Sequence, residues 1–161
     1  MRYSFCFILV FLFQVSSSFA QGRKLPDISF KIHTTEFANA NRGYNEGNEY
    51  TDTLKDEVIL YKLAAILREH EDLNIELIGH TAINESANLG LDRAEVVRDF
   101  IIKLGTKADR ITVTNKFHAD PIISDRILLS LPSSEEKNAA NQKNRRVEIK
   151  VSKAKAKTKD K

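Results

Sequence analysis

The sequence predicts a two-layer α/β (α+β) sandwich, in which helices cover one face of a small mixed sheet. Segments of strand character alternate along the chain with two long segments of amphipathic helical character. The predicted order is strand, helix, strand, helix, strand, an irregular stretch and a last strand. Because crossover connections between parallel strands are right-handed, we expect both helices on the same face of the sheet.

The composition fits one compact domain. The chain has 161 residues, of which 42% are hydrophobic and 29% are charged, so it can build an ordinary core. Its one cysteine, Cys6, lies inside an apolar run near the N-terminus. If that run is removed, the mature chain has no thiol, which excludes disulfides, a cysteine nucleophile and a metal bound by cysteine.

Residues 1–20 have the pattern of a secretory signal peptide. Arg2 precedes an apolar run at 5–13, and the small residues Ser18 and Ala20 stand three and one positions before a cut at Gln21. The run is too short to cross a bilayer comfortably, so we expect no integral membrane segment after cleavage. The alternative is that the segment is retained as an N-terminal anchor.

The C-terminal residues 153–161 are rich in lysine and are predicted to be a disordered tail. Such a tail either keeps the protein soluble or attracts an anionic surface. The formal net charge is only +3, and no basic helix has interleaved aromatic residues. Together with the export signal, this pattern disfavours nucleic acid as a partner.

The first predicted strand covers residues 28–37. It begins with apolar residues at alternate positions, Ile28, Phe30 and Ile32, which is typical of a strand with one buried face. Residues 38–52 are polar and rich in asparagine and glycine, so they are predicted to form a loop. That loop is longer than a simple connection requires, and such loops often carry function.

The first predicted helix covers residues 54–70. Its apolar residues recur at helical spacing with charged residues between them, which predicts one buried face. They fall into two neighbouring sets, Leu54, Val58, Tyr61 and Ala65 in one, and Leu60, Leu63 and Leu67 in the other.

A second strand and helix follow. Residues 74–78 predict a short strand that Gly79 ends, and Ser86 is the expected N-cap of the next helix. Gly105 is the expected glycine at its C-terminal end. The buried stripe of this helix is predicted at Leu89, Ala94, Val97, Ile101 and Leu104.

The rest of the chain predicts two strands with an irregular stretch between them. Residues 110–117 are rich in β-branched side chains and predict the third strand. Within 119–143, two prolines interrupt regular structure, and 133–141 predicts a short helix. Residues 146–151 alternate in polarity and predict the last strand.

Two segments carry a resemblance to a known family. One begins with Gly79-His80-Thr81 at a strand end and continues with Leu89-Gly90-Leu91-Asp92-Arg93-Ala94 at a helix start. The other is Asn144-Arg145-Arg146-Val147-Glu148. Together they resemble the OmpA-like peptidoglycan-binding domain. The resemblance implies such a domain over residues 21–152, in a non-catalytic protein of the bacterial periplasm or cell envelope.

The resemblance also implies a ligand and the residues that hold it. OmpA-like domains bind peptidoglycan non-covalently through the diaminopimelate residue of the stem peptide. Its free end is an amino-acid zwitterion, which requires an acceptor for the ammonium and a planar donor for the carboxylate. The family arginine falls on Arg93, the family asparagine on Ser86, and the family aspartate on Ala82, which has no acceptor.

The remaining expected ligand contacts lie close to these positions. Glu85 is the expected substitute for the missing acid, in a turn shorter than the family usually has. Thr81, at the strand end, is expected either to line the pocket or only to form the turn. Asn144 and Arg145 are expected to support the site. The alternatives are an Arg93 that pairs on the surface with Glu95 or Asp99, and an Asn144-Arg145 pair that simply begins the last strand.

No other chemistry stands out in the sequence. The histidines have no paired metal-ligand spacing, and there is no phosphate-binding loop, dinucleotide motif or nucleophile motif. We therefore predict no catalytic residue, metal or cofactor. The alternative function is an OmpA-like scaffold that has lost wall binding and holds an envelope protein partner, through the loop or the tail. A secreted hydrolase would require a pair of carboxylates that face a cleft.

Overall fold

The structure is a computed structural model that describes residues 25–38 and 56–154. The predicted signal peptide lies outside these residues, and so do nearly all of the predicted loop at 38–52 and residues 155–161 of the predicted tail. In the described part of the chain, no helix has both the length and the apolar character needed to cross a membrane.

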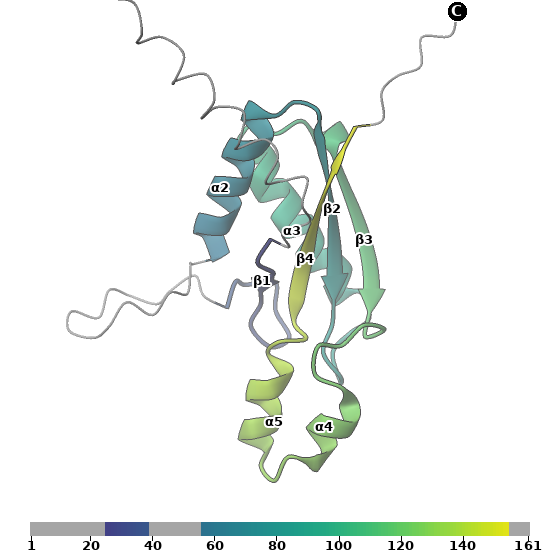
Figure 1. The fold of residues 1–161 in the computed structure, drawn as a ribbon. Helices are drawn as coiled ribbons and strands as arrows, with labels where there is room; N and C mark the ends of the chain where they lie inside the picture. The colour runs from purple at the N-terminus through teal and green to yellow at the C-terminus, as the bar shows by residue number, and fades with distance from the viewer. Residues whose placement is uncertain (1–24, 39–55, 155–161) are drawn as a thin grey trace, which may run out of the picture.

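A four-stranded mixed sheet forms one layer of the fold (Figure 1). The strand order is β1-β4-β2-β3, where β2 is parallel to β3 and antiparallel to β4, and β4 is antiparallel to β1. The strands are β1 (Ile28–Ser29), β2 (Leu73–His80), β3 (Ile111–Phe117) and β4 (Arg146–Lys153). The mixed sheet is the one that the sequence predicts, and β4 includes Lys153, the first residue of the predicted tail.

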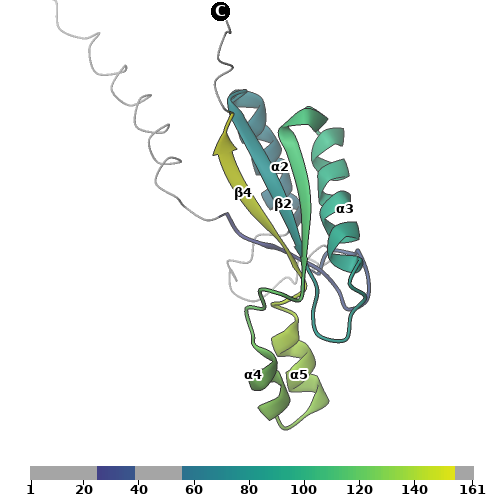
Figure 2. The ribbon, with the colours of Figure 1, turned by 90° about the vertical axis from the view of Figure 1, so that its right-hand side faces the viewer.

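The second layer is made by α2 (Asp56–Glu69) and α3 (Leu89–Lys103), which lie on the same face of the sheet (Figure 2). The two-layer α/β sandwich is therefore confirmed. Apolar side chains of both helices meet those of the central strands in a single core. Its fully or nearly fully buried members include Leu60, Leu63 and Leu67 from α2, Val97 and Ile101 from α3, and Ile75, Leu77 and Ile149 from the sheet.

The buried face of α2 corrects one prediction. Of the two predicted sets, the one that contains Leu60, Leu63 and Leu67 is buried, whereas Val58 and Tyr61 are exposed. A helix turns about 100° per residue, which places the two sets on opposite sides of the helix, so only one of them can face the sheet. The ring of Tyr61 instead packs edge-to-face with the ring of Phe100, and the two ring centroids are 5.6 Å apart.

The first predicted strand is wrong in length. β1 ends at Ser29, and Phe30 pairs with Phe37 through an isolated bridge. Between them the chain turns back, with a hydrogen bond of 2.9 Å from the Lys31 N–H to the Glu36 carbonyl. The turn includes a residue with positive φ, His33 at 55°. It interrupts the alternation that the sequence suggests, and Ile32 is exposed.

The structure contradicts the prediction for the start of α3 and confirms the prediction for its end. The helix begins at Leu89 with Asn88 at the N-cap position, so the predicted N-cap at Ser86 is wrong. The Ser86 carbonyl instead accepts a hydrogen bond from the Leu89 N–H, in a turn that precedes the helix. At the other end, Gly105 adopts a φ of 98°, as expected for a glycine that follows a helix.

A close contact between two glycines sets where α3 lies on β2. A Cβ atom on Gly79 would lie 1.8 Å from the carbonyl oxygen of Gly90. Only a residue without a side chain allows the strand and the helix to approach this closely. Arg93 is one helical turn after Gly90, so this contact also positions its side chain at the end of β2.

Two short helices, α4 (Asp125–Ser130) and α5 (Ser134–Asn141), lie beyond the end of the sheet at which β2 and β3 finish (Figures 1 and 2). The sequence predicts α5, whose N-cap Ser133 accepts a hydrogen bond from the Glu136 N–H, but not α4. A single turn, η1 (Ala108–Arg110), precedes β3.

Candidate ligand site at the end of the central strand

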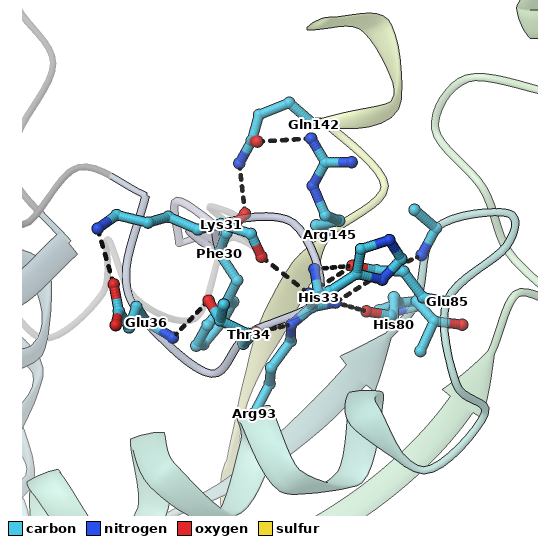
Figure 3. Close-up of polar contacts among 12 residues, drawn as sticks. Phe30, Lys31, His33, Thr34, Glu36, His80, Glu85, Arg93, Gln142 and Arg145 are labelled. Carbon is cyan, nitrogen blue, oxygen red and sulfur yellow. Dashed lines mark hydrogen bonds and ion pairs between the residues drawn. The ribbon is translucent and has the colours of Figure 1, made fainter. Parts of the chain in front are cut away.

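The site is built around the side chain of Arg93. It extends from the first half of α3 toward the end of β2 and the turn at residues 31–36 (Figure 3). The whole residue is inaccessible to solvent, with 0% of its surface exposed. Arginine is rarely buried unless its charge is compensated, so its partners decide what it can do.

All five N–H groups of the Arg93 guanidinium have partners within the protein. Nε donates to the Thr34 carbonyl at 3.0 Å. Nη1 donates to the His80 carbonyl at 3.4 Å and to Glu85 Oε2 at 2.8 Å. Nη2 donates to the Lys31 carbonyl at 3.1 Å and to Glu85 Oε1 at 2.8 Å. A guanidinium has five N–H donors, so none remains for a ligand in this conformation.

The Glu85 carboxylate is equally well satisfied. Besides the two bonds from Arg93, Oε1 accepts the His33 N–H and Oε2 accepts the Ala82 N–H, each at 2.9 Å. Only 1% of the Glu85 side chain is exposed. Burial by itself raises the pKa of this carboxyl, but the hydrogen bonds from Arg93, Ala82 and His33 outweigh it and lower the pKa below its ordinary value.

An aromatic ring completes the surroundings of the guanidinium. The Cζ atom of Arg93 lies 5.4 Å from the ring centroid of Phe30, within the range of a cation–π contact. Arg93 therefore joins the first-strand region, the end of β2, the turn at 31–36 and the segment that carries Glu85. A two-point ion pair of this kind fixes geometry as well as charge.

The backbone around this site is conformationally unusual. Among the described residues, the non-glycine residues with positive φ are His33 at 55°, Asn84 at 71° and Phe117 at 52°. His33 donates to Glu85, Asn84 precedes it, and the Phe117 carbonyl accepts the Thr81 N–H at 2.9 Å. Such conformations cluster where the surrounding structure enforces them, often at functional sites.

The other residues predicted around the strand end are placed differently. Ala82 is buried and offers the site only its backbone N–H. Thr81 is also buried, and its carbonyl lies 3.2 Å from Nδ1 of His118. Ser86 is exposed on the outside of the turn. The structure therefore brings Glu85 and the backbone N–H of Ala82 together beside Arg93, while the hydrogen bonds given for Thr81 go to Phe117 and His118, and Ser86 lies at the margin.

Asn144 is fully buried and joins the chain before α4 to the start of β4. Its Oδ1 accepts the Ile123 N–H at 2.9 Å. Its Nδ2 donates to the Ile123 carbonyl at 2.9 Å and to Asn141 Oδ1 at 3.0 Å. These bonds hold the α4–α5 segment against the end of the sheet.

Arg145 is also buried at the start of β4, but in the described part of the chain few of the N–H groups of its guanidinium have partners. Nη2 donates to the Asn138 carbonyl at 3.1 Å and to Gln142 Oε1 at 2.7 Å. Nε has no hydrogen-bond partner within residues 25–38 and 56–154. Burial lowers the pKa of this guanidinium; the charge of Glu85 opposes that shift and the charge of Arg93 adds to it.

His80 adds no positive charge to the site. Its ring is buried, and Nε2 lies 3.5 Å from Glu148 Oε2. Burial, followed by the charge of Arg146, lowers the pKa of His80 to about 4, against the opposing effect of Glu148. The imidazole is therefore neutral at neutral pH.

The alternative of a surface pairing for Arg93 is wrong, since its partner is Glu85 and Asp99 pairs with Arg98 at 3.2 Å. The carbonyl groups of Lys31 and Thr34 are contacts that the sequence did not reveal. No sequence signal could have identified them, because any residue offers the same carbonyl and only the turn brings these two to Arg93.

The comparison with family profiles identifies the fold. The profile of the OmpA family matches residues 46–145, which is more than half of the chain. The chain belongs to the OmpA family. No protein of curated function matches it in sequence.

Solved structures of this family superpose on the chain. The C-terminal domain of MotB from Helicobacter pylori has a TM-score of 0.54 at 19% identity, over 79% of this chain and 84% of that domain. The peptidoglycan-associated lipoprotein of Burkholderia pseudomallei has a TM-score of 0.56 at 18% identity, over 78% of this chain and 89% of that one. At these identities the likeness shows the shared OmpA-like fold.

Proposed function

We propose that this protein is a non-catalytic component of the bacterial cell envelope, and that its OmpA-like domain associates with peptidoglycan in the periplasm. Membership of the OmpA family supports the proposal. So does the likeness to a peptidoglycan-associated lipoprotein. The export signal expected at residues 1–20 agrees with this location.

The observation that carries the proposal is the set of donors that converges at the end of β2. The fork of Arg93 and the backbone N–H groups of Ala82 and His33 all point at one carboxylate. This is the arrangement needed to hold the carboxylate of a diaminopimelate residue. Here Glu85 supplies the carboxylate, so a wall ligand that uses Arg93 must replace Glu85.

We further propose that wall binding is weak. Ala82 provides no acceptor for the ligand ammonium, and Glu85 is already engaged with Arg93. An ammonium that loses its water without an acidic partner costs on the order of 3 kcal/mol, or about a hundredfold in affinity. Thr81, Ser86, Asn144 and Arg145 remain proposed contacts around the ligand, and of these only Arg145 has a buried donor without a partner.

The same geometry favours a second candidate function. With every N–H group of Arg93 and both oxygens of Glu85 in use, the pair is complete without a ligand. In that case the domain is a scaffold that has lost wall binding and holds an envelope protein partner.

Sedimentation with purified cell walls distinguishes peptidoglycan binding from the scaffold function. We expect the mature protein to pellet with diaminopimelate-type sacculi and not with lysine-type sacculi, because lysine lacks the second carboxylate. Free diaminopimelate should release the pelleted protein, and free lysine should not. Equal pelleting with both wall types, or none with either, would eliminate diaminopimelate recognition and favour the scaffold. The test uses unmodified protein because loss of the buried Arg93 would also disturb folding.

A further inference from the structure

We infer that Glu85 is a built-in carboxylate ligand, which occupies an anion site formed by Arg93 and the backbone N–H groups of Ala82 and His33 and is exchanged for an external carboxylate when residues 83–88 move. We call these residues the Glu85 loop. The inference rests on the proposed function, because it describes how access to the same site is controlled.

The contacts of Glu85 are those of a bound ligand. Its carboxylate receives two bonds from the guanidinium fork and two from backbone N–H groups. None of the four depends on the rest of the glutamate side chain. A free carboxylate of similar shape, placed at the same point, would make the same four bonds.

The Glu85 loop can leave without opening the hydrophobic core. The core cluster contains no residue from 83–88. The outer residues of the loop, Asn84, Ser86, Ala87 and Asn88, are exposed. Apart from the partial burial of Ile83 and a hydrogen bond of 3.0 Å from Asn115 Nδ2 to the Ala87 carbonyl, the loop is held mainly by the ion pair and the hydrogen bonds of Glu85. Segments with few buried apolar contacts are those that open at low cost.

The backbone on both sides of the carboxylate also favours exchange. Asn84 immediately precedes Glu85 and has a φ of 71°, and His33, which donates to Glu85, has a φ of 55°. Asparagine and histidine tolerate this region better than most residues but still prefer negative φ. Movement of the loop would release Asn84 from this conformation, which partly offsets the loss of the ion pair.

The charges of the cluster select an anion. The buried guanidinium of Arg93 holds the carboxylate of Glu85 at two points, and the charge of that carboxylate also acts on the buried guanidinium of Arg145. Within residues 25–38 and 56–154, the hydrogen bonds of Arg145 go only to uncharged oxygens. When the Glu85 loop leaves, the fork of Arg93 faces the space that the carboxylate occupied. A planar carboxylate fits the fork of Arg93 with two parallel bonds.

Chemical rescue with acetate tests the inference on the mature full-length chain. Glu85→Ala removes the internal carboxylate and leaves the donors in place. Its urea unfolding is measured in sodium acetate and in sodium chloride of equal ionic strength at pH 7. We expect acetate at ten times its dissociation constant to raise the folded-to-unfolded ratio of this variant about elevenfold. The wild type should show no such response.

Two controls make the response specific. Glu36→Ala removes an exposed glutamate from the neighbouring turn, where Glu36 pairs with Lys31, and should respond to acetate no more than the wild type does. In the Glu85→Ala background, the further change Arg145→Met removes the second buried positive charge and should weaken acetate binding several-fold. An acetate response of Glu85→Ala equal to that of the wild type would overturn the inference.

A second variant covers the case in which Glu85→Ala does not fold. Glu85→Gln keeps the shape of the side chain and weakens its pairing with Arg93. Titration of this variant with free diaminopimelate should shift the amide signals of Ala82 and His33, the two backbone donors of the site. If neither signal moves in Glu85→Gln, the inference is wrong.

Sacculus sedimentation of the same variants distinguishes this inference from the proposed function. An increase in pelleting for Glu85→Ala over the wild type supports both. An acetate response without pelleting of any form supports the exchange and overturns peptidoglycan binding. Pelleting of the wild type, with no acetate or diaminopimelate response in either Glu85 variant, supports peptidoglycan binding and overturns the exchange.

Discussion

Arg93 and Arg145 are both buried at the same end of the fold, yet they have opposite surroundings. Arg93 has a partner for each of its N–H groups and a carboxylate bound at two points. Arg145 has uncharged partners for Nη2 and a buried Nε without one. Burial and residue type therefore do not by themselves make a ligand site. A ligand site also requires donors that are free or that an internal partner can release.

The largest expected loss of stability comes from replacing Arg93, because each of its N–H groups has a partner. Arg93→Met leaves the buried carboxylate of Glu85 without its cation, so we expect it to lower the free energy of unfolding by about 3–5 kcal/mol. Urea unfolding followed by circular dichroism measures this. Arg98→Met, on an exposed part of the same helix, is the matched control and should change stability by less than about 0.5 kcal/mol. Similar losses in both variants would show that the Arg93 pair is not special.

A change at the contact between strand and helix should move Arg93 but not Arg145. In Gly79→Ala the new Cβ meets the carbonyl of Gly90, which is backbone and cannot rotate away. We expect a loss of about 1–3 kcal/mol as α3 shifts from β2. Amide chemical shifts should change around Glu85 and remain constant around Asn138. If both regions shift equally, the two arginines are mechanically coupled.

The Glu85 carboxylate should make part of the stability depend on pH. Its pKa in the folded protein is lowered, so the unfolded chain binds the proton more readily. The contribution is therefore complete above the ordinary glutamate pKa of about 4.3 and is lost as the pH falls through the lower folded value. Urea unfolding from pH 7 to pH 3 should show a steeper acid loss in the wild type than in Glu85→Gln. Parallel curves would assign the acid loss to other carboxylates.

The smallest effect is expected at Arg145. Arg145→Met loses two hydrogen bonds from Nη2 but also removes a buried cation that those bonds compensate only in part. These terms oppose each other, so we expect a change of less than about 1 kcal/mol in the free energy of unfolding. The same substitution at Arg93 serves as its comparison. A loss at Arg145 as large as that at Arg93 would remove the contrast between them.

The regular elements of the fold were largely predictable. The stripe of α3 and the glycine after it follow from local spacing and backbone freedom, and the structure confirms Val97, Ile101 and Gly105 in these roles. The predicted N-cap at Ser86 failed because a turn from Ser86 to Leu89 precedes the helix. The continuous strand at 28–37 failed because the polar residues at its centre form a turn.

The sequence predicted which residues form the site better than it predicted how these residues contact one another. The sequence placed Arg93 at the helix start and named Glu85 as the substitute for the missing acid. It assigned both to an external zwitterion, one to each charge. The structure instead joins them to each other, because the short Glu85 loop folds back far enough for the carboxylate to reach the guanidinium.

The sequence by itself determined the family, the two-layer fold and the arginine at the end of the central strand, because these depend on motifs and on local periodicity. Only the tertiary structure decided how many of that arginine's donors are occupied. The carbonyls of Lys31 and Thr34 come from 62 and 59 positions away, and no local pattern records their arrival. Hydrogen bonds to backbone groups depend on where the chain returns in space and not on which side chains it carries.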